Sequence, residues 1–200
     1  YLENYEFKLV RESLKEREVI FHIAPNITRP IPFIIPHSKE MRPAWLIKIG
    51  LFLYDFLAGK SVIPKSKSIN LVKEFPNLLK KKFIKGFQYY DLQVDDKKLT
   101  QLNAQDAKKN SALILENTKV NNVERFKDYW KIFLENDRVI TAKVLVNATG
   151  PWINEVIKDI IKIKSKKSIR LVKGSHIIIK KLYNQEVAFT LQNKDKRIIF

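Results

Sequence analysis

Apolar residues recur along this chain at two spacings, and the spacing predicts which segments are helices and which are strands. Repeats of three and four residues are typical of helices with one buried face, whereas alternation and short β-branched runs are typical of strands. The helical spacing predicts helices over Glu6–Ala24, Pro43–Leu57, Lys97–Lys109 and Trp152–Ile161. The other runs predict strands over Thr28–Pro36, Gly86–Val94, Ala112–Val120, Tyr129–Leu134, Val139–Asn147, Ile169–Lys180, Val187–Leu191 and Ile198–Phe200.

This order of elements predicts a mixed α/β (α+β) fold. Three prolines within Thr28–Pro36 favour an edge strand, because proline has no N–H to give to a neighbouring strand. Asp95 and Asp96 directly precede a predicted helix, and acidic residues there are typical of an N-cap. A general base is the alternative interpretation of this acidic pair. Asn136 with Asp137, and the segment Asn193–Lys196, predict turns between strands.

The helix predicted over Pro43–Leu57 is the most apolar in the chain, and Gly59 marks its end. Its apolar residues cover more than one face, which favours a helix buried in a core. Trp45 and the nearby lysines leave a second interpretation open, in which this helix touches a bilayer surface. The Lys80–Lys82 turn would then lie close to anionic lipid.

The stretch Val144–Trp152 combines a strand, a tight turn and the start of a helix. Val144–Val146 is a short apolar run that predicts a strand buried on both faces. Ala148, Thr149 and Gly150 are small and allow a backbone to approach a ligand, and Pro151 suits the first helical position. Open α/β sheets bind nucleotides at such turns, where the helix start favours a phosphate. On local physics alone, an ordinary connection between a strand and a helix is an equal alternative.

The composition argues against several kinds of site and partner. The chain has no cysteine and three scattered histidines, so we expect neither disulfides nor a metal site. Its net charge of +17 is spread over most segments, and we therefore do not expect a nucleic acid as partner. No apolar run approaches the roughly 20 residues that a membrane-spanning helix needs, and no signal peptide is visible.

The segment Asn147-Ala-Thr-Gly-Pro-Trp152 resembles the NATGPW segment of the FAD-dependent, quinone-linked (aerobic-type) glycerol-3-phosphate dehydrogenases. Further stretches agree with that family in the same order along the chain. They are Tyr1–Phe7, Arg42–Trp45 with Ile49–Phe52, Val94–Asp96, Arg170–His176 and Leu191–Phe200. Several separate motifs in the correct order are much more specific than any one of them.

The resemblance implies a domain organisation. It places the helical cap and part of the substrate domain at residues 1–94, and the second half of a Rossmann-like FAD-binding domain at 95–164. Residues 165–200 would begin an antiparallel substrate-binding sheet. The chain contains no G-x-G-x-x-G, which in that family lies before Tyr1, and the substrate's phosphate ligands lie after Phe200. We therefore expect an internal fragment that is inactive alone.

The resemblance also implies an activity and its site. The family oxidises sn-glycerol 3-phosphate to dihydroxyacetone phosphate with FAD, and passes the electrons to quinone at the cytoplasmic face of the inner membrane. The implied parent is a peripheral membrane protein and a possible homodimer. The implied FAD contacts are Thr118, Val120, Ala148, Thr149, Gly150 and Trp152. Lys173, Gly174 and Ser175 would lie on the substrate side, with His176 taking the alcohol proton or serving a structural role.

Three other functions stay open. A flavoprotein of the same fold could oxidise amino or hydroxy acids, since the Ala-Thr-Gly turn does not separate these groups. A non-catalytic basic module could bind lipid or nucleic acid through its lysines. The chain could also be a truncated remnant without activity.

Overall fold

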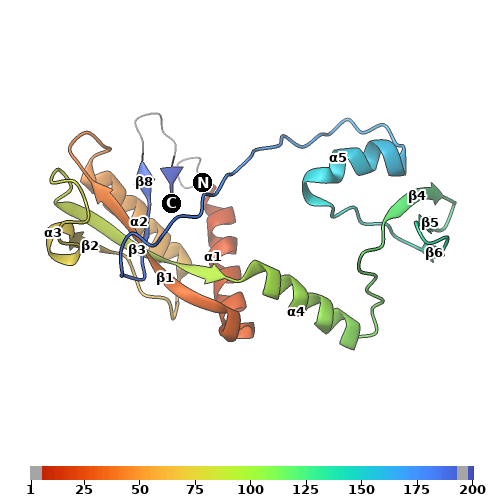
Figure 1. Ribbon diagram of the computed structural model, residues 1–200, viewed down its shortest axis with the longest axis horizontal. Helices are drawn as coiled ribbons and strands as arrows, with labels where there is room; N and C mark the ends of the chain where they lie inside the picture. The colour runs from red at the N-terminus through yellow and green to blue at the C-terminus, as the bar shows by residue number, and fades with distance from the viewer. Residues whose placement is uncertain (1–5, 193–197) are drawn as a thin grey trace. The chain divides into compact units, whose positions relative to one another are not determined.

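The computed structural model describes residues 6–192 and 198–200 (Figure 1). The chain forms two compact units, of which unit 1 comprises Tyr1–Asp106 with Lys180–Phe200, and unit 2 comprises Ala107–Ile179. The mixed α/β class is confirmed by helices and by sheets with antiparallel and parallel pairs. The domain boundaries predicted after residues 94 and 164 stay a prediction.

Unit 1 is built on a four-stranded sheet in the order β2-β3-β1-β7. Its long strands, β1 (Thr28–His37) and β3 (Lys85–Val94), pair antiparallel over their whole length. β2 (Lys67–Asn70) extends β3, and β7 (Ala188–Phe189) runs parallel to β1. A separate hairpin joins β8 (Leu191–Gln192) to β9 (Ile198–Ile199). Its predicted turn, Asn193–Lys196, lies outside the described residues.

The prolines of β1 all face one edge of that strand. Alternate residues of a strand direct their backbone N–H and C=O groups to the same side, and Pro30, Pro32 and Pro36 alternate in this way with Ile34. The Ile34 carbonyl oxygen accepts a hydrogen bond from the Thr190 N–H, directly after β7. The missing N–H groups therefore lie on the β7 side, and the antiparallel ladder with β3 is left intact. The predicted edge position is wrong, because β7 pairs with Phe33 and Ile34. This pairing is limited to the proline-free stretch.

Helix α1 (Phe7–Ile23) and helix α4 (Asp96–Lys109) confirm two of the predicted helices. α1 buries Val10, Leu14 and Arg17, which are spaced by four and three residues. The Asp95 carboxylate accepts a hydrogen bond from the Lys98 N–H at 3.0 Å, so the predicted cap of α4 is confirmed. The short helices η2 (Pro25–Ile27) and α3 (Leu71–Glu74) were not predicted.

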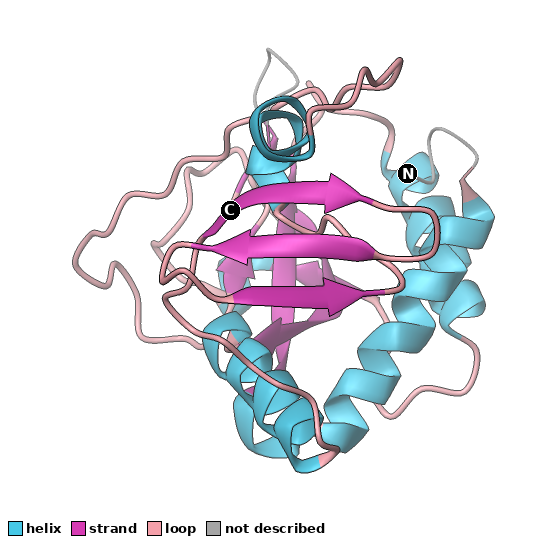
Figure 2. Ribbon diagram, turned by 90° about the vertical axis from the view of Figure 1, so that its right-hand side faces the viewer, coloured by secondary structure: helices cyan, strands magenta, loops and turns pink. Residues whose placement is uncertain are grey.

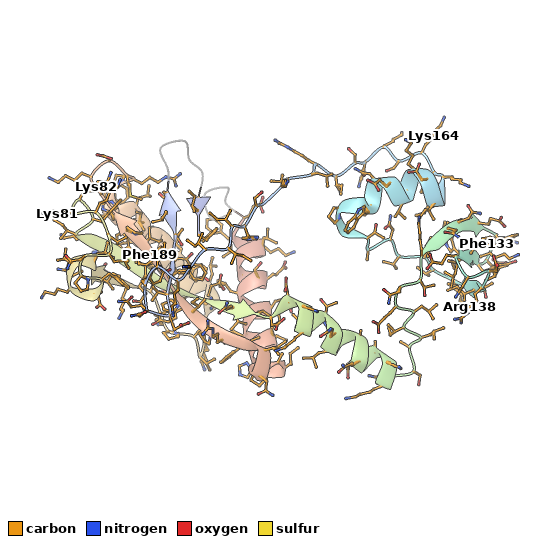
Figure 3. All side chains as sticks on the ribbon, in the orientation of Figure 1. Lys81, Lys82, Phe133, Arg138, Lys164 and Phe189 are labelled. Carbon is orange, nitrogen blue, oxygen red and sulfur yellow. The ribbon has the colours of Figure 1, made fainter. Side chains whose placement is uncertain are left out.

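One hydrophobic cluster of unit 1 packs on the face of the sheet to which Ile34 points. Its fully buried side chains are Ile34 and Leu71, surrounded by Ile69, Phe75 and Phe189. The Phe189 ring meets Phe75 edge-on at 5.2 Å, which brings the C-terminal segment into the same core. Lysines such as Lys81, Lys82 and Lys164 carry the charge on exposed segments, as expected from their scatter along the chain (Figure 3).

Helix α2 (Ala44–Ala58) forms where a helix was predicted, but it is not a core helix. It has no buried residue, and the side chains of Trp45 and Phe56 are 63% and 71% exposed. The expectation of burial is therefore wrong for the part of the chain that the structure describes. The apolar residues of α2 cover more than one face, and one helix face cannot bury them all.

Unit 2 holds a three-stranded antiparallel meander of β4 (Val120–Arg125), β5 (Trp130–Leu134) and β6 (Val139–Ala142), seen face on in Figure 2. Val123, Ile132 and Leu134 form its core. A helical run follows, made of η3 (Gly150–Trp152), α5 (Ile153–Glu155) and the π-helix η4 (Val156–Ile161). This run covers the helix predicted over Trp152–Ile161, which is thereby confirmed. Its residues Ile160 and Ile161 pack on the meander core.

Three predicted strands of unit 2 differ from the structure. A turn at Glu116 and Asn117 interrupts Ala112–Val120, so the strand begins only at Val120. Val144–Val146 was expected to be a buried strand, yet it pairs with no described strand, and Val144 and Val146 are 72% and 77% exposed. The Ile169–Lys180 segment is likewise extended, exposed and unpaired within the described residues. Apolar periodicity predicts that these segments are strands. A strand also needs a neighbouring strand to pair with, and the periodicity does not identify one.

Candidate functional site: a cleft beside the Asn147–Trp152 turn

Unit 2 contains a cleft of about 650 Å³ between the start of β4, the Asn147–Trp152 turn and the following helical run. Its volume falls in the usual range for small-molecule sites, roughly 300–1,000 Å³. Val120, Val146 and Trp152 line it with apolar surface. Glu155 and Asp159 add carboxylates from the helical run. The cleft therefore suits a mostly apolar ligand that is held by few polar groups.

Side-chain hydrogen bonds shape the turn itself. The Asn147 Oδ1 accepts hydrogen bonds from the Thr149 hydroxyl at 2.7 Å and from the Thr149 N–H at 3.4 Å. Asn147 Nδ2 donates to the Ile153 carbonyl at 3.3 Å, which ties the turn to the first helical residues. Gly150 has a φ of +56°, a conformation that a side chain resists. The local geometry thus favours asparagine and glycine at these two positions.

The predicted FAD contacts gather around this cleft. Thr118, Val120, Thr149 and Trp152 line it, although Thr118 and Trp152 are 34 positions apart in the sequence numbering. Ala148 and Gly150 belong to the same turn without lining the cleft. The contact of these six residues with FAD stays a prediction.

The predicted substrate-side residues lie elsewhere. Lys173, Gly174, Ser175 and His176 form part of the exposed extended segment and do not line the cleft of unit 2. Their role at the substrate stays a prediction. Within residues 6–192 and 198–200, no group of three metal-ligating side chains comes together.

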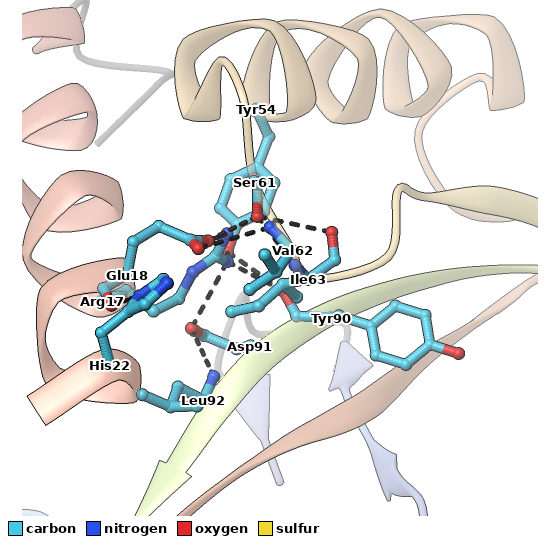
Figure 4. Close-up of polar contacts among 10 residues, drawn as sticks. All are labelled: Arg17, Glu18, His22, Tyr54, Ser61, Val62, Ile63, Tyr90, Asp91 and Leu92. Atoms are coloured by element: carbon cyan, nitrogen blue, oxygen red, sulfur yellow. Dashed lines mark hydrogen bonds and ion pairs between the residues drawn. The ribbon is translucent and has the colours of Figure 1, made fainter. Parts of the chain in front are cut away.

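A polar cluster in unit 1 was not predicted at all (Figure 4). The buried Arg17 Nη1 donates to the Tyr54 hydroxyl at 2.8 Å and to the Tyr90 carbonyl at 3.2 Å. The guanidinium also lies 3.8 Å from Asp91 and 3.6 Å from Glu18. Burial, with the nearby Asp91 charge, raises the pKa of Tyr54 well above its ordinary value. The signal was present in the sequence, because Arg17 continues the helical spacing of Val10 and Leu14.

Comparison with known proteins identifies the family of this chain. A model of FAD dependent oxidoreductases matches residues 1–200. The chain belongs to this family. The membership confirms FAD as the predicted cofactor, and it confirms the predicted likeness to glycerol-3-phosphate dehydrogenases together with the relatives below.

The relatives are sugar-alcohol phosphate dehydrogenases. The chain is 45% identical to a glycerol-3-phosphate dehydrogenase of Pseudomonas aeruginosa, over all of this chain and 40% of the relative. It is 42% identical to a D-erythritol 1-phosphate dehydrogenase of Brucella abortus, over all of this chain and 41% of the relative. It is 40% identical to an aerobic glycerol-3-phosphate dehydrogenase of Escherichia coli, over all of this chain and 40% of the relative. The chain thus spans about two fifths of the length of these relatives.

Two solved structures share the fold. One is a glycerol-3-phosphate dehydrogenase from Bacillus halodurans complexed with FAD, with a TM-score of 0.53 and 23% identity over 72% of this chain and 26% of that chain. The other is an L-proline dehydrogenase from P. horikoshii, with a TM-score of 0.54 and 20% identity over 78% of this chain and 41% of that chain. These similarities confirm the mixed α/β fold.

The unit 2 cleft fits one part of FAD better than another. Its apolar walls and the Thr118 and Thr149 hydroxyls suit an uncharged ring system. Glu155 and Asp159 would repel the pyrophosphate, whose usual glycine-rich cradle is not in this sequence. Residues of this cleft would therefore hold a ring portion of FAD and leave its phosphates to other groups.

Proposed function

We propose that this chain is part of an FAD-dependent dehydrogenase that oxidises sn-glycerol 3-phosphate to dihydroxyacetone phosphate and passes the electrons to quinone. The observation that carries the proposal is the 45% identity to a glycerol-3-phosphate dehydrogenase over all 200 residues. In the net reaction a secondary alcohol becomes a ketone, and its two electrons and two protons reduce one quinone to a quinol. When bound, FAD would supply the hydride acceptor, and the protein would position the alcohol.

The relatives support a second candidate substrate. The D-erythritol 1-phosphate dehydrogenase is 42% identical over the whole chain, close to the value for the glycerol 3-phosphate enzyme. Both named substrates are phosphate monoesters of short polyols, so either enzyme class must recognise a phosphate and a neighbouring hydroxyl. This chemistry supports a polyol phosphate rather than an amino acid as the substrate.

The protein that carries this sequence should be purified with FAD and mixed anaerobically with each candidate. Bleaching of the flavin absorbance by glycerol 3-phosphate, at a kcat/KM above that for erythritol 1-phosphate, would support the proposal. Faster bleaching by erythritol 1-phosphate would instead support erythritol 1-phosphate as the substrate. Bleaching only by amino or hydroxy acids would contradict both.

The proposed location is the cytoplasmic face of the inner membrane, with peripheral attachment. Quinone dissolves in the bilayer, and α2 exposes Trp45 and Phe52 beside a basic chain of net charge +17. In the part of the chain that the structure describes, no helix is long and apolar enough to cross a bilayer. Binding to anionic vesicles that weakens with salt would support attachment. Full recovery in the supernatant at low salt would refute it.

A further inference from the structure

Unit 2 contains a further concave site, of about 540 Å³, where the helical run ends and the loop 162–168 begins. Four of the side chains that line it are lysines, Lys158, Lys162, Lys164 and Lys167, and we call it the lysine pocket. Lys164 is labelled in Figure 3. Among the described residues that line the pocket, none is an aspartate or a glutamate. The pocket therefore gathers charge of one sign around a single space.

The helical run directs acidic and basic side chains to different sites. Glu155 and Asp159 line the unit 2 cleft, whereas Asn154 and Lys158 line the lysine pocket. Residues four positions apart lie on the same face of a helix, so the two pairs mark two faces of this run. The carboxylates of the run thus face the proposed FAD site and leave the charge of the lysine pocket in place.

The lysines of the pocket are not neutralised by neighbouring acids. Lys162 Nζ donates a hydrogen bond to the neutral Asn122 Oδ1 of β4 at 3.1 Å. In the part of the chain that the structure describes, Lys158, Lys164 and Lys167 form no ion pair. Their positive charge is therefore available to an anion from solution.

Side-chain hydrogen bonds hold the loop of the pocket in shape. Asn154 Nδ2 donates to the Ile169 carbonyl oxygen, and Asn154 Oδ1 accepts from the Ile169 N–H, both at 3.4 Å. Within the loop, the Ser165 hydroxyl donates to the Lys167 carbonyl oxygen at 2.8 Å and accepts from the Lys167 N–H at 3.1 Å. A preformed loop loses less conformational freedom when a ligand binds.

The composition of the pocket favours a compact phosphate anion. Lysine binds phosphate as a point charge, and a phosphate monoester carries about −1.5 to −2 charge near neutral pH. Lysines around one space repel one another, and a multivalent anion between them removes this repulsion. The described residues that line the pocket include no aromatic ring on which a nucleic-acid base could stack. The pocket therefore fits a small phosphate better than a nucleic acid.

We propose that the lysine pocket binds a phosphate group, carried either by a small soluble anion or by a lipid head group. Lys158, Lys164 and Lys167 would supply the charge, and Lys162 is already fixed beside them by Asn122. The inference goes beyond the proposed function and does not depend on it, because the pocket and the unit 2 cleft are lined by different residues.

The test uses the FAD-loaded protein that carries this sequence and titrates it with pyrophosphate in an isothermal calorimeter at low salt. Pyrophosphate supplies the phosphate charge without the alcohol group that the proposed reaction oxidises. The test variant, Lys164→Gln with Lys167→Gln, removes two lysines of the pocket. The matched control, Lys143→Gln with Lys166→Gln, removes the same charge from the same unit at exposed residues that do not line the pocket.

A second arm separates the two sources of phosphate. The same proteins are sedimented with vesicles of phosphatidylglycerol, which is anionic, and with vesicles of phosphatidylcholine, which has no net charge. Binding of pyrophosphate that depends on Lys164 and Lys167 would assign the pocket to a soluble anion. If pyrophosphate does not bind, a preference for phosphatidylglycerol with the same dependence would assign it to a lipid head group.

We expect the test variant to weaken pyrophosphate binding by about tenfold or more, since two charge-assisted contacts are lost. The control should change it by no more than about twofold, because solvent and salt screen more distant charges. Equal weakening by both variants would show an effect of net charge alone and would overturn the inference. Binding that neither variant changes, or no binding of either probe, would overturn it as well. Flavin bleaching by glycerol 3-phosphate decides the proposed function separately.

Discussion

Individual residues stabilise this protein through a buried charge that they pair or through a backbone geometry that they allow. Arg17 is the clearest case, because a cation buried on an apolar helix face is stable only with paired acids and hydrogen bonds. Its Nε is buried without a hydrogen-bond partner among the described residues, so the pairing depends on the two Nη atoms. Arg17 thereby links α1 with Tyr54 of α2 and with Tyr90 and Asp91 of β3.

Gly86 allows β3 to approach its neighbours closely. A Cβ there would lie 2.9 Å from the Ile35 carbonyl oxygen and 2.9 Å from a Leu71 methyl group. We predict that Gly86→Ala lowers the free energy of unfolding by about 1–3 kcal/mol, the usual cost of overpacking. Urea denaturation checks this. Gly50→Ala is the control, since that Cβ meets open space and alanine favours a helix. An equal effect of both variants would contradict the steric account.

His176 is the candidate for the group that takes the alcohol proton in the proposed reaction. We predict that His176→Ala slows anaerobic flavin bleaching by glycerol 3-phosphate by about 10²–10⁴-fold, the range for general acid–base groups. FAD content should stay unchanged, because the segment around His176 does not line the unit 2 cleft. An unaltered bleaching rate would assign this histidine a structural role.

At the scale of elements, sequence reasoning succeeded where local chemistry decides the conformation. The caps and turn residues Asp95, Asp137 and Gly150 lie where they were predicted, because each satisfies or permits a backbone geometry by itself. It failed where a strand needs a distant partner, as at Val144–Val146 and Ile169–Lys180. β4 was missed because Asn121, Asn122 and Glu124 resemble a polar loop.

The same reasoning named four residues that line the unit 2 cleft, but it did not relate the residues of a second cleft, in unit 1. The residues of the Asn147–Trp152 turn are contiguous, and a family resemblance added Thr118 and Val120. This second cleft, of about 710 Å³, joins residues from α1, α2, β1, β3, β8 and β9, and no local pattern relates them. Spatial juxtaposition of this kind requires the tertiary structure.

The Asp95 cap makes the stability of α4 depend on pH. The Lys98 N–H, with the Lys98 side chain, lowers the pKa of Asp95 below its ordinary value. A carboxylate with a lowered folded-state pKa stabilises the fold above its unfolded pKa, and this stability is lost as the pH falls through the folded value. We therefore predict that the stability difference between the unaltered protein and Asp95→Ala shrinks as the pH is lowered from 6 toward roughly 2. Urea unfolding at several pH values measures it.

Asp95→Asn separates the two contributions, because asparagine also caps helices but carries no charge. Its stability relative to Asp95→Ala should stay nearly constant over the same pH range. A difference that grows in acid would contradict the role of the carboxylate.

At the scale of the whole molecule, many large apolar side chains remain exposed in both units. The fully exposed Ile178 and the mostly exposed Val146 and Phe200 are examples. Apolar surface of this extent is typical of a binding face or of an aggregation site. The relatives are about two and a half times as long as this chain, since it covers 40% of them.

We predict that residues 1–200 expressed alone bind no FAD, oxidise no glycerol 3-phosphate and aggregate. The unit 2 cleft lacks a pyrophosphate cradle, and the margin of stability of a whole domain is only about 5–15 kcal/mol. Size-exclusion chromatography with flavin absorbance measures both properties. A monomeric, yellow protein that unfolds cooperatively would show the prediction wrong.

The row of prolines in β1 determines what amide hydrogen exchange can report about this sheet. Pro30, Pro32 and Pro36 carry no exchangeable amide, so between Arg29 and His37 the N–H of Ile34 is the one amide on the β7-facing edge of this strand. The odd-numbered amides report on pairing with β3 instead. Exchange at Ile34 therefore measures how often β7 detaches from the sheet while the rest of β1 stays protected. β7 lies more than 150 positions further along the sequence.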